Sequence, residues 1–153
     1  SSVAMAAAQI VKHVSPGTQT IGLTTSPKKI ATIQAMPESR FDHLVATRDQ
    51  AGGDVDWRRE LLRITNNQGV DVFFDPVASG DYLNTEIRSL AMHGSIFVYG
   101  LLGKPGVVDV SPLMRKFASI QGWVLTELVM AGPAQFTPGC MHVLDGFAQG
   151  IYR

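Results

Sequence analysis

The sequence is short of the features that mark secreted, membrane-spanning and nucleic-acid-binding proteins. It has one cysteine, Cys140, which cannot form an internal disulfide and fits a reducing compartment. No apolar run approaches the ~20 residues that span a membrane, and the start lacks the basic region of a signal peptide. Thirteen basic and thirteen acidic residues cancel, and the basic ones are scattered along the chain. We therefore expect a cytoplasmic protein with no nucleic-acid or membrane partner.

Several catalytic signatures are also missing. No glycine-rich loop ends in Gly-Lys-Ser/Thr, which argues against a P-loop enzyme. Ser1-Ser2 has no flanking glycines of a nucleophile elbow, which argues against a hydrolase. The histidines are far apart, and none pairs with Cys140 at a metal-ligand spacing: His13, His43, His93 and His142. We predict no metal site.

The most informative stretch is Gly69–Gly103, which reads as strand, helix, strand. Gly69–Asp75 and Ser95–Gly103 are apolar runs without alternation, as in strands covered on both faces. Between them, residues 81–92 carry apolar side chains at helical spacing, and His93-Gly94 is expected to stop the helix. A β-α-β unit places both strand ends on one edge, where ligands bind in open sheets. Function is therefore expected around residues 75–78 and 100–103.

The rest of the chain alternates in the same way. Ser26-Pro27 is predicted to be the N-cap and first position of a helix. The other expected elements are helices over 1–14, 28–36, 56–67 and 111–118 and from 132 onward, with strands over 18–25, 41–47 and 119–125. This alternation predicts an α/β fold, a doubly wound parallel sheet forming one domain over residues 1–153.

The alternation starts on a helix rather than a strand. In the dinucleotide-binding fingerprint G-x-G-x-x-G/A, the third small residue lies just inside a helix, and Ala4 fits that place after Ser2 and Val3. The preceding strand and glycines are then absent from this chain. We expect the chain to be part of a longer protein and inactive in isolation; the alternative is an alanine-rich helix that only packs in the core.

Four segments in order resemble the medium-chain dehydrogenase/reductase superfamily. They are Ser1–Val11, Gly69–Val77, Gly94–Gly103 and Ile120–Trp123. The nearest branch is the zinc-independent quinone oxidoreductases, which include zeta-crystallin. The resemblance implies a Rossmann domain that binds NAD(P)H, next to a GroES-like substrate domain not contained in this chain. Ala4 stands where the family usually has glycine.

The residues after the second expected strand indicate which nucleotide, NAD or NADP, is bound. An acid there would bind the 2′-hydroxyl of NAD, but the sequence has Thr25, Ser26, Lys28 and Lys29. Two lysines at a helix N-terminus are disfavoured by ~0.3–1 kcal/mol each unless an anion is bound. We predict that these four residues hold the 2′-phosphate of NADP; the alternative is a solvated lysine pair.

The resemblance also implies contacts for the rest of the cofactor. Val77, Gly100, Leu101 and Leu102 would lie against the ribose and nicotinamide, and Thr47 near the adenine. Gly100 has a physical reason, because a residue without a side chain lets the backbone approach a flat ring. The alternative is an ordinary glycine at a strand end. No catalytic acid can be named.

The expected last strand, residues 119–125, is apolar and would form an edge prone to pairing. The resemblance implies that this edge pairs with its copy in a homodimer; the alternative is an edge covered by the C-terminal segment. The function predicted is hydride transfer from NADPH to a quinone or an activated C=C or C=O bond. The alternatives are an enoyl-thioester reductase and a non-catalytic dinucleotide-binding or structural protein.

Overall fold

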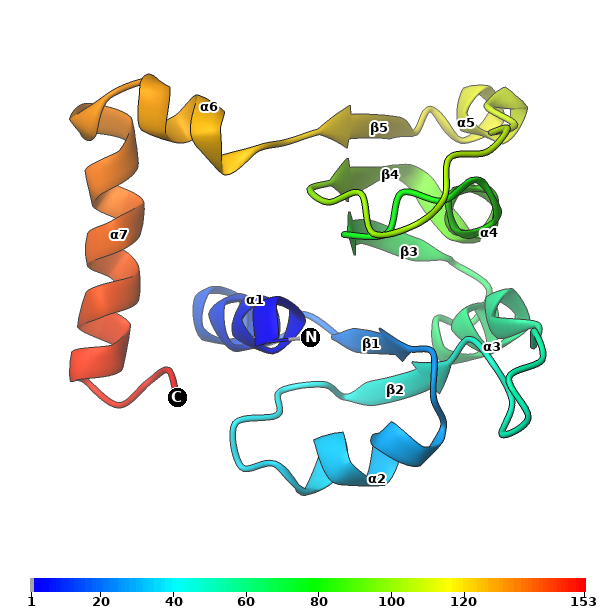
Figure 1. The fold of residues 1–153 in the computed structure, drawn as a ribbon, viewed down its shortest axis with the longest axis horizontal. Coiled ribbons are helices and arrows are strands. Elements are labelled where there is room, and N and C mark those ends of the chain that lie inside the picture. Colours follow the sequence, from blue (N-terminus) through cyan, green and yellow to red (C-terminus); the bar gives the residue numbers. More distant parts are fainter. Residues whose placement is uncertain (1) are drawn as a thin grey trace. The chain divides into compact units, whose positions relative to one another are not determined.

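The computed structural model describes residues 2–153, which alternate between helices and parallel strands (Figure 1). They divide into two compact units, residues 1–57 with 131–153 and residues 58–130. Each unit has its own parallel sheet, of two strands in the first unit and of three strands, paired in chain order, in the second. The prediction of an α/β fold with parallel strands is confirmed. Ser1, where the expected first helix and the resemblance begin, lies outside the described residues.

The first unit pairs two short strands of the same direction. Its elements are α1 (Ser2–Val14), β1 (Ile21–Thr24), α2 (Lys28–Ala35), β2 (His43–Ala46) and α7 (Pro133–Ala148). The register aligns Ile21 with His43 and Thr24 with Ala46. Among residues 2–153, β1 has β2 as its only ladder partner, so its other edge carries no strand.

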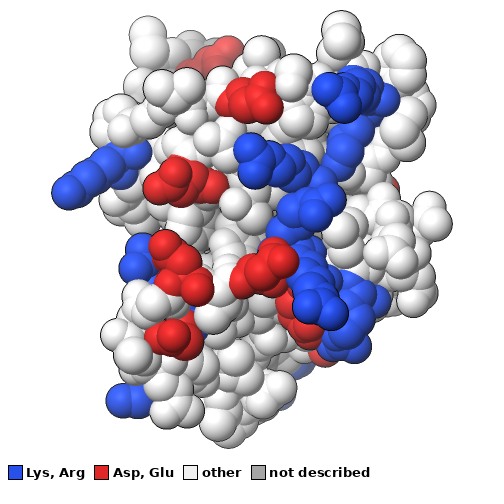
Figure 2. All heavy atoms as spheres, turned by 90° about the vertical axis from the view of Figure 1, so that its right-hand side faces the viewer, with Lys and Arg blue, Asp and Glu red and all other residues white. Residues whose placement is uncertain are grey.

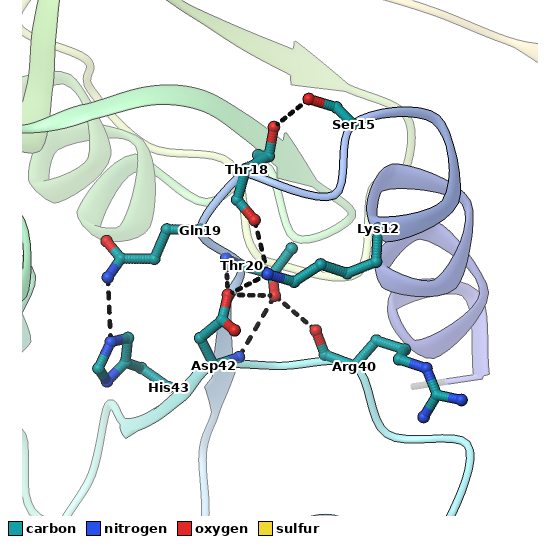
Figure 3. A network of polar contacts seen from close by, with 8 residues as sticks. All are labelled: Lys12, Ser15, Thr18, Gln19, Thr20, Arg40, Asp42 and His43. Atoms are coloured by element: carbon teal, nitrogen blue, oxygen red, sulfur yellow. Dashed lines mark hydrogen bonds and ion pairs between the residues drawn. The ribbon is translucent and has the colours of Figure 1, made fainter.

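A polar network fixes the end of α1 to the starts of β1 and β2 (Figure 3). Lys12 Nζ lies 2.7 Å from an Asp42 carboxylate oxygen and donates a hydrogen bond to the carbonyl of Thr18. The same Asp42 oxygen accepts from the backbone amide of Thr20 at 2.7 Å. Lys12 is in the last turn of α1, where a cation is favoured by the helix dipole. The amino ends of both strands are thus tied to one helix end.

The C-terminal residues return to α1. Gln9 of α1 is buried and pairs with the backbone of Arg153, accepting from its amide at 2.8 Å and donating to its carbonyl at 3.2 Å. The Tyr152 hydroxyl contacts Nε2 of His142 on α7 at 2.7 Å. The Tyr152 ring lies against Gly146, where a methyl group would overlap it. A glycine in α7 therefore makes the space for this ring.

The second unit is a three-stranded parallel sheet with helices between its strands. It comprises most of α3 (Trp57–Ile64), then β3 (Val70–Asp75), α4 (Gly80–Ser89), β4 (Leu90–Val98), α5 (Ser111–Lys116), β5 (Ser119–Gly122) and α6 (Leu125–Met130). β4 is central, and both α4 and α5 contact it. The core includes Leu61, Ile87, Leu90 and Ile96, each almost fully buried.

The expected boundary between α4 and β4 was wrong. The helix ends at Ser89 and the strand starts at Leu90, so His93 and Gly94 lie within β4 rather than stopping the helix. The ladder with β3 is irregular there, because Val70 pairs with Leu90 and Val72 with Ser95. His93 takes a left-handed φ of 62° in this bulge.

Most other elements are shorter than expected, and two of these differences bear on the predicted sites. β5 ends at Gly122, and Leu125 begins α6, so the edge strand covers residues 119–122 and not 119–125. Pro27 is the N-cap of α2, so the prediction that Ser26 caps the helix was wrong. No helix among the described residues is long and apolar enough to cross a membrane.

Candidate functional site

The loop after β3 is built around a buried carboxylate. Asp75 is 1% exposed, and its two oxygens accept hydrogen bonds from the backbone amides of Val77 at 2.6 Å and Ala78 at 2.9 Å. Ala78 takes a left-handed φ of 51°. Ser79 then caps α4, its hydroxyl accepting from the amide of Tyr82. Asp75 therefore has the structural role of shaping the loop that carries Val77.

The segment after β4 continues alongside this loop. The amide of Leu102 donates to the carbonyl of Pro76 at 3.0 Å, and that of Gly103 donates to the carbonyl of Val77 at 2.6 Å. A methyl group on Gly100 would lie 2.6 Å from the Pro76 carbonyl oxygen, closer than real side chains come. The structure thus brings together the predicted residues Val77, Gly100 and Leu102.

The two apolar side chains that follow Gly100 are exposed to solvent. Leu101 is 85% exposed and Leu102 is 81% exposed. The following loop is held by Asn84 of α4, whose side chain donates to the carbonyl of Val107 at 2.9 Å and accepts from the amide of Asp109 at 2.8 Å. Sequence reasoning missed Asn84, because an asparagine on an amphipathic helix carries no signal of the loop that it binds.

A second carboxyl group is buried near Asp75. Glu86 of α4 is 3% exposed, and its Oε2 has no hydrogen-bond partner among the described residues. Burial, and then the charge of Asp75, raise the pKa of Glu86 to about 9. The pKa of Tyr99 is also raised, again by burial first and then by Asp75. Sequence reasoning missed Glu86, since its spacing on α4 is that of any helical residue.

The first unit holds the other predicted residues. The amide of Thr47 donates to the carbonyl of Thr24 at 2.8 Å, so the ends of β2 and β1 meet at one edge. Thr25 and Ser26 follow from this edge into α2, while Thr47 itself is 2% exposed. Parallel pairing of β1 with β2 thus brings Thr47 to the segment that begins at Thr25.

Lys28 and Lys29 form the first turn of α2. Both side chains are exposed, the turn has no acidic residue, and the N-cap Pro27 offers no side-chain acceptor. Two ammonium groups at the positive end of a helix dipole favour a bound anion. Both lysines lie at the start of a helix, as the sequence predicts, and their contact with a phosphate stays a prediction.

Ser2, Val3 and Ala4 lie in the first turn of α1. Ser2 and Val3 are exposed, Ala4 is half-buried, and the turn has no acidic residue. These three belong to the first unit together with Thr25–Lys29 and Thr47, whereas Val77 and residues 100–102 belong to the second. The predicted residues therefore form two sets, one in each unit.

No group of three or more His, Cys, Asp or Glu side chains that could hold a metal ion is found within residues 2–153. Cys140 is a free, half-buried thiol on α7. The described residues therefore do not fit a zinc ion, and no chemical step is assigned to one.

Comparison with known proteins identifies a family model that covers most of the chain. The model for the zinc-binding dehydrogenases matches residues 2–138. A phenolphthiocerol synthesis polyketide synthase of Mycobacterium marinum is 27% identical over 150 residues, which are 97% of this chain and 6% of that protein.

Solved structures share the fold at low identity. A mycobacterial quinone oxidoreductase superposes with a TM-score of 0.81 at 15% identity, over 100% of this chain and 44% of that one. A putative enoyl reductase domain of a polyketide synthase gives a TM-score of 0.71 at 23% identity, over 97% of this chain and 76% of that one. These matches establish the Rossmann-like fold, and the chain spans less than half of the quinone oxidoreductase.

Proposed function

The chain belongs to the zinc-binding dehydrogenase family, within the medium-chain dehydrogenase/reductase superfamily, and from that premise we propose that it binds NADPH for hydride transfer to a quinone or an activated C=C or C=O bond. It is the cofactor-binding domain of an oxidoreductase of this superfamily. The chemistry that a nicotinamide supplies when bound is hydride transfer.

The observation that carries the proposal is the pairing of residues 100–103 with residues 76–77. Backbone bonds hold the two segments side by side, and the absence of a side chain at Gly100 leaves their backbones in contact. Leu101 and Leu102 add an exposed apolar surface beside the glycine. A flat, largely apolar ring fits such a surface, and the chain's part in catalysis is to position that ring.

The choice of NADP over NAD rests on the first turn of α2. Lys28 and Lys29 are exposed at a helix N-terminus without an acid, which favours a phosphate over a ribose hydroxyl. The test is titration of the full-length protein with both nucleotides. We expect tighter binding of NADP, and a loss of about tenfold or more in the K28Q/K29Q variant, with NAD binding unchanged.

The matched control is R88Q/R115Q, which removes the same charge from exposed positions of the second unit. It should bind NADP as the unmodified protein does. A preference for NAD in the unmodified protein would contradict the assignment to NADP.

The substrate class has two candidates. The quinone assignment is supported by the fold shared with the mycobacterial quinone oxidoreductase, and an enoyl thioester by the likeness to the polyketide synthase and to the putative enoyl reductase domain. NADPH oxidation by the full-length protein, measured with quinones and with enoyl thioesters, separates them. Turnover of neither, with intact NADPH binding, would instead favour a non-catalytic dinucleotide-binding protein.

We also propose a homodimer formed through β5. Within the described residues this strand pairs with β4 alone, and the residues after it, Trp123 and Val124, are 44% and 58% exposed. An open strand edge followed by exposed apolar side chains favours pairing with a second copy. A monomeric mass for the full-length protein in sedimentation would overturn this. The single free thiol, Cys140, supports a cytoplasmic location.

A further inference from the structure

Basic side chains that are far apart in the sequence come together within the second unit, and Figure 2 shows a run of Lys and Arg side chains in blue. In the second unit, four of them converge from three helices. Arg58 lies in α3, Arg88 near the end of α4, and Arg115 and Lys116 at the end of α5. We call these four residues the basic stripe. These four basic residues are scattered along the sequence but lie together in the folded second unit.

The stripe is centred on the end of α4. Lys116 Nζ donates to the carbonyls of Ile87, Arg88 and Leu90, at 3.4, 2.9 and 2.5 Å. Arg58 Nε donates to the carbonyl of Arg88 at 3.4 Å. These carbonyls carry the negative end of the helix dipole, which explains why two cations converge there.

Convergence of the cations has an electrostatic cost. Burial, and then the charge of Arg58, lower the pKa of Lys116. The side chains of Arg88 and Arg115 are exposed. Asp109 offsets part of their charge: the pKa of Asp109 is lowered first by hydrogen bonds from Ser111 and then by both arginines. An anion from outside would relieve the remaining repulsion.

Exposed apolar side chains flank the stripe. Phe117 follows Lys116, is 71% exposed and stacks on the His93 ring at 5.7 Å between centroids. Met114 is 76% exposed and Met92 is 56% exposed. Arginine, methionine and aromatic residues are the types enriched at protein–protein interfaces.

We propose that the basic stripe and Phe117 bind an acidic segment of a partner protein. Arginine forks pair with carboxylates in a bidentate way, and the apolar rim takes hydrophobic side chains between the acids. A nucleic acid fits less well, because the exposed apolar side chains of Phe117, Met114 and Met92 call for apolar partner groups, which a peptide supplies together with its charge.

The stripe lies at the amino ends of the strands of its own sheet. Arg88 precedes β4 and Lys116 precedes β5, whereas Val77 and residues 100–102 follow the carboxyl ends of β3 and β4. Partner binding at the stripe therefore leaves the candidate cofactor residues of this unit uncovered. The proposal does not depend on the identity of the cofactor or substrate.

The test measures binding of a fluorescein-labelled peptide rich in glutamate and leucine to the full-length protein by fluorescence anisotropy. A peptide with glutamine in place of every glutamate and a single-stranded DNA of equal net charge are run in parallel. We expect the glutamate peptide to bind, to be released as NaCl rises, and to bind about three- to tenfold more weakly to R88Q/R115Q.

Two further variants complete the design. F117S should also weaken binding of the glutamate peptide. K28Q/K29Q removes equal charge from the first unit and should leave peptide binding unchanged. An unchanged midpoint of urea unfolding shows that R88Q/R115Q is folded. Equal peptide binding by R88Q/R115Q and the unmodified protein, no binding at low salt, or DNA binding as tight as that of the peptide would each overturn the proposal.

Discussion

Glu86 and Asp75 are two buried carboxyl groups whose charges interact within one sheet-and-helix unit. Asp75 uses both oxygens to accept backbone hydrogen bonds from Val77 and Ala78. Glu86 has no such donors at Oε2, and its pKa is raised to about 9. At neutral pH Glu86 therefore keeps its proton.

The first prediction concerns stability against pH. Folded Glu86 keeps its proton up to about pH 9, whereas the unfolded chain releases it near the ordinary value of 4.5. The unfolded state therefore binds fewer protons across this window, and stability should fall as pH rises from 4.5 to 9, by up to ~1.4 kcal/mol per pH unit. Urea unfolding of the full-length protein at a series of pH values measures this slope.

The variant E86Q should flatten the slope, because glutamine does not titrate. E127Q is the matched control, since Glu127 is exposed on α6 and its change should leave the slope intact. A slope that is the same in E86Q and in the unmodified protein would show that Glu86 does not hold the proton.

The second prediction concerns Asp75 itself. An asparagine there keeps one acceptor oxygen and turns an NH₂ group toward a backbone amide, so D75N should lose one of the two bonds to Val77 and Ala78. We expect a loss of ~2 kcal/mol in the free energy of unfolding and a higher KM for NADPH. The loss should be smaller at high pH, where Glu86 ionises and the charge on Asp75 becomes unfavourable.

The third prediction tests the close backbone approach at Gly100. In G100A the new methyl group meets the Pro76 carbonyl oxygen at 2.6 Å, so the loop must move. We expect destabilisation of ~1–3 kcal/mol and weaker NADPH binding. G122A is the control, because nothing lies within 4 Å of a methyl group there and Gly122, the last residue of β5, also lies at the carboxyl end of a strand. Equal effects of the two substitutions would mean that contact with Pro76 does not matter.

Much of the fold could be predicted from the sequence because its elements are locally specified. β2 falls within the strand expected over residues 41–47, and β3 ends at Asp75 as expected. The start of β4 could not be predicted in this way. Leu90–Met92 continues the helical spacing of α4. These residues nevertheless belong to a strand, because β4 pairs with β3, which is distant in the sequence.

Residues of the candidate site also differ in whether the sequence could predict them. The proximity of Gly100, Val77 and Leu102 could be predicted because they follow strands whose carboxyl ends share an edge. Asn84, Glu86 and the basic stripe were missed, because each depends on which helix face meets which loop. Lys116 and Arg88 are 28 residues apart in the chain and are joined by one hydrogen bond. Spacing in the sequence does not encode such a pairing.

The last prediction concerns the anchor of α1 (Figure 3). Lys12 and Asp42 are 22% and 39% exposed with their charged atoms 2.7 Å apart, whereas Arg48 and Asp54 are 48% and 88% exposed and 3.7 Å apart. K12M also removes the bond to the Thr18 carbonyl and the favourable charge in the last turn of α1. We therefore expect K12M to cost ~1 kcal/mol in the free energy of unfolding and R48M a few tenths at most.

Acid should weaken the same anchor. Burial acts to raise the pKa of Asp42, but the hydrogen bonds from Lys12 and Thr20 outweigh it, and the pKa is lowered. An acid whose pKa is lowered by folding stabilises the protein above its unfolded value of 3.8, and this contribution is lost as pH falls through the folded pKa. The difference in unfolding free energy between K12M and the unmodified protein should therefore shrink below about pH 4. A difference that stays constant into acid would assign the effect of K12M to the Thr18 bond and the helix end instead of the carboxylate.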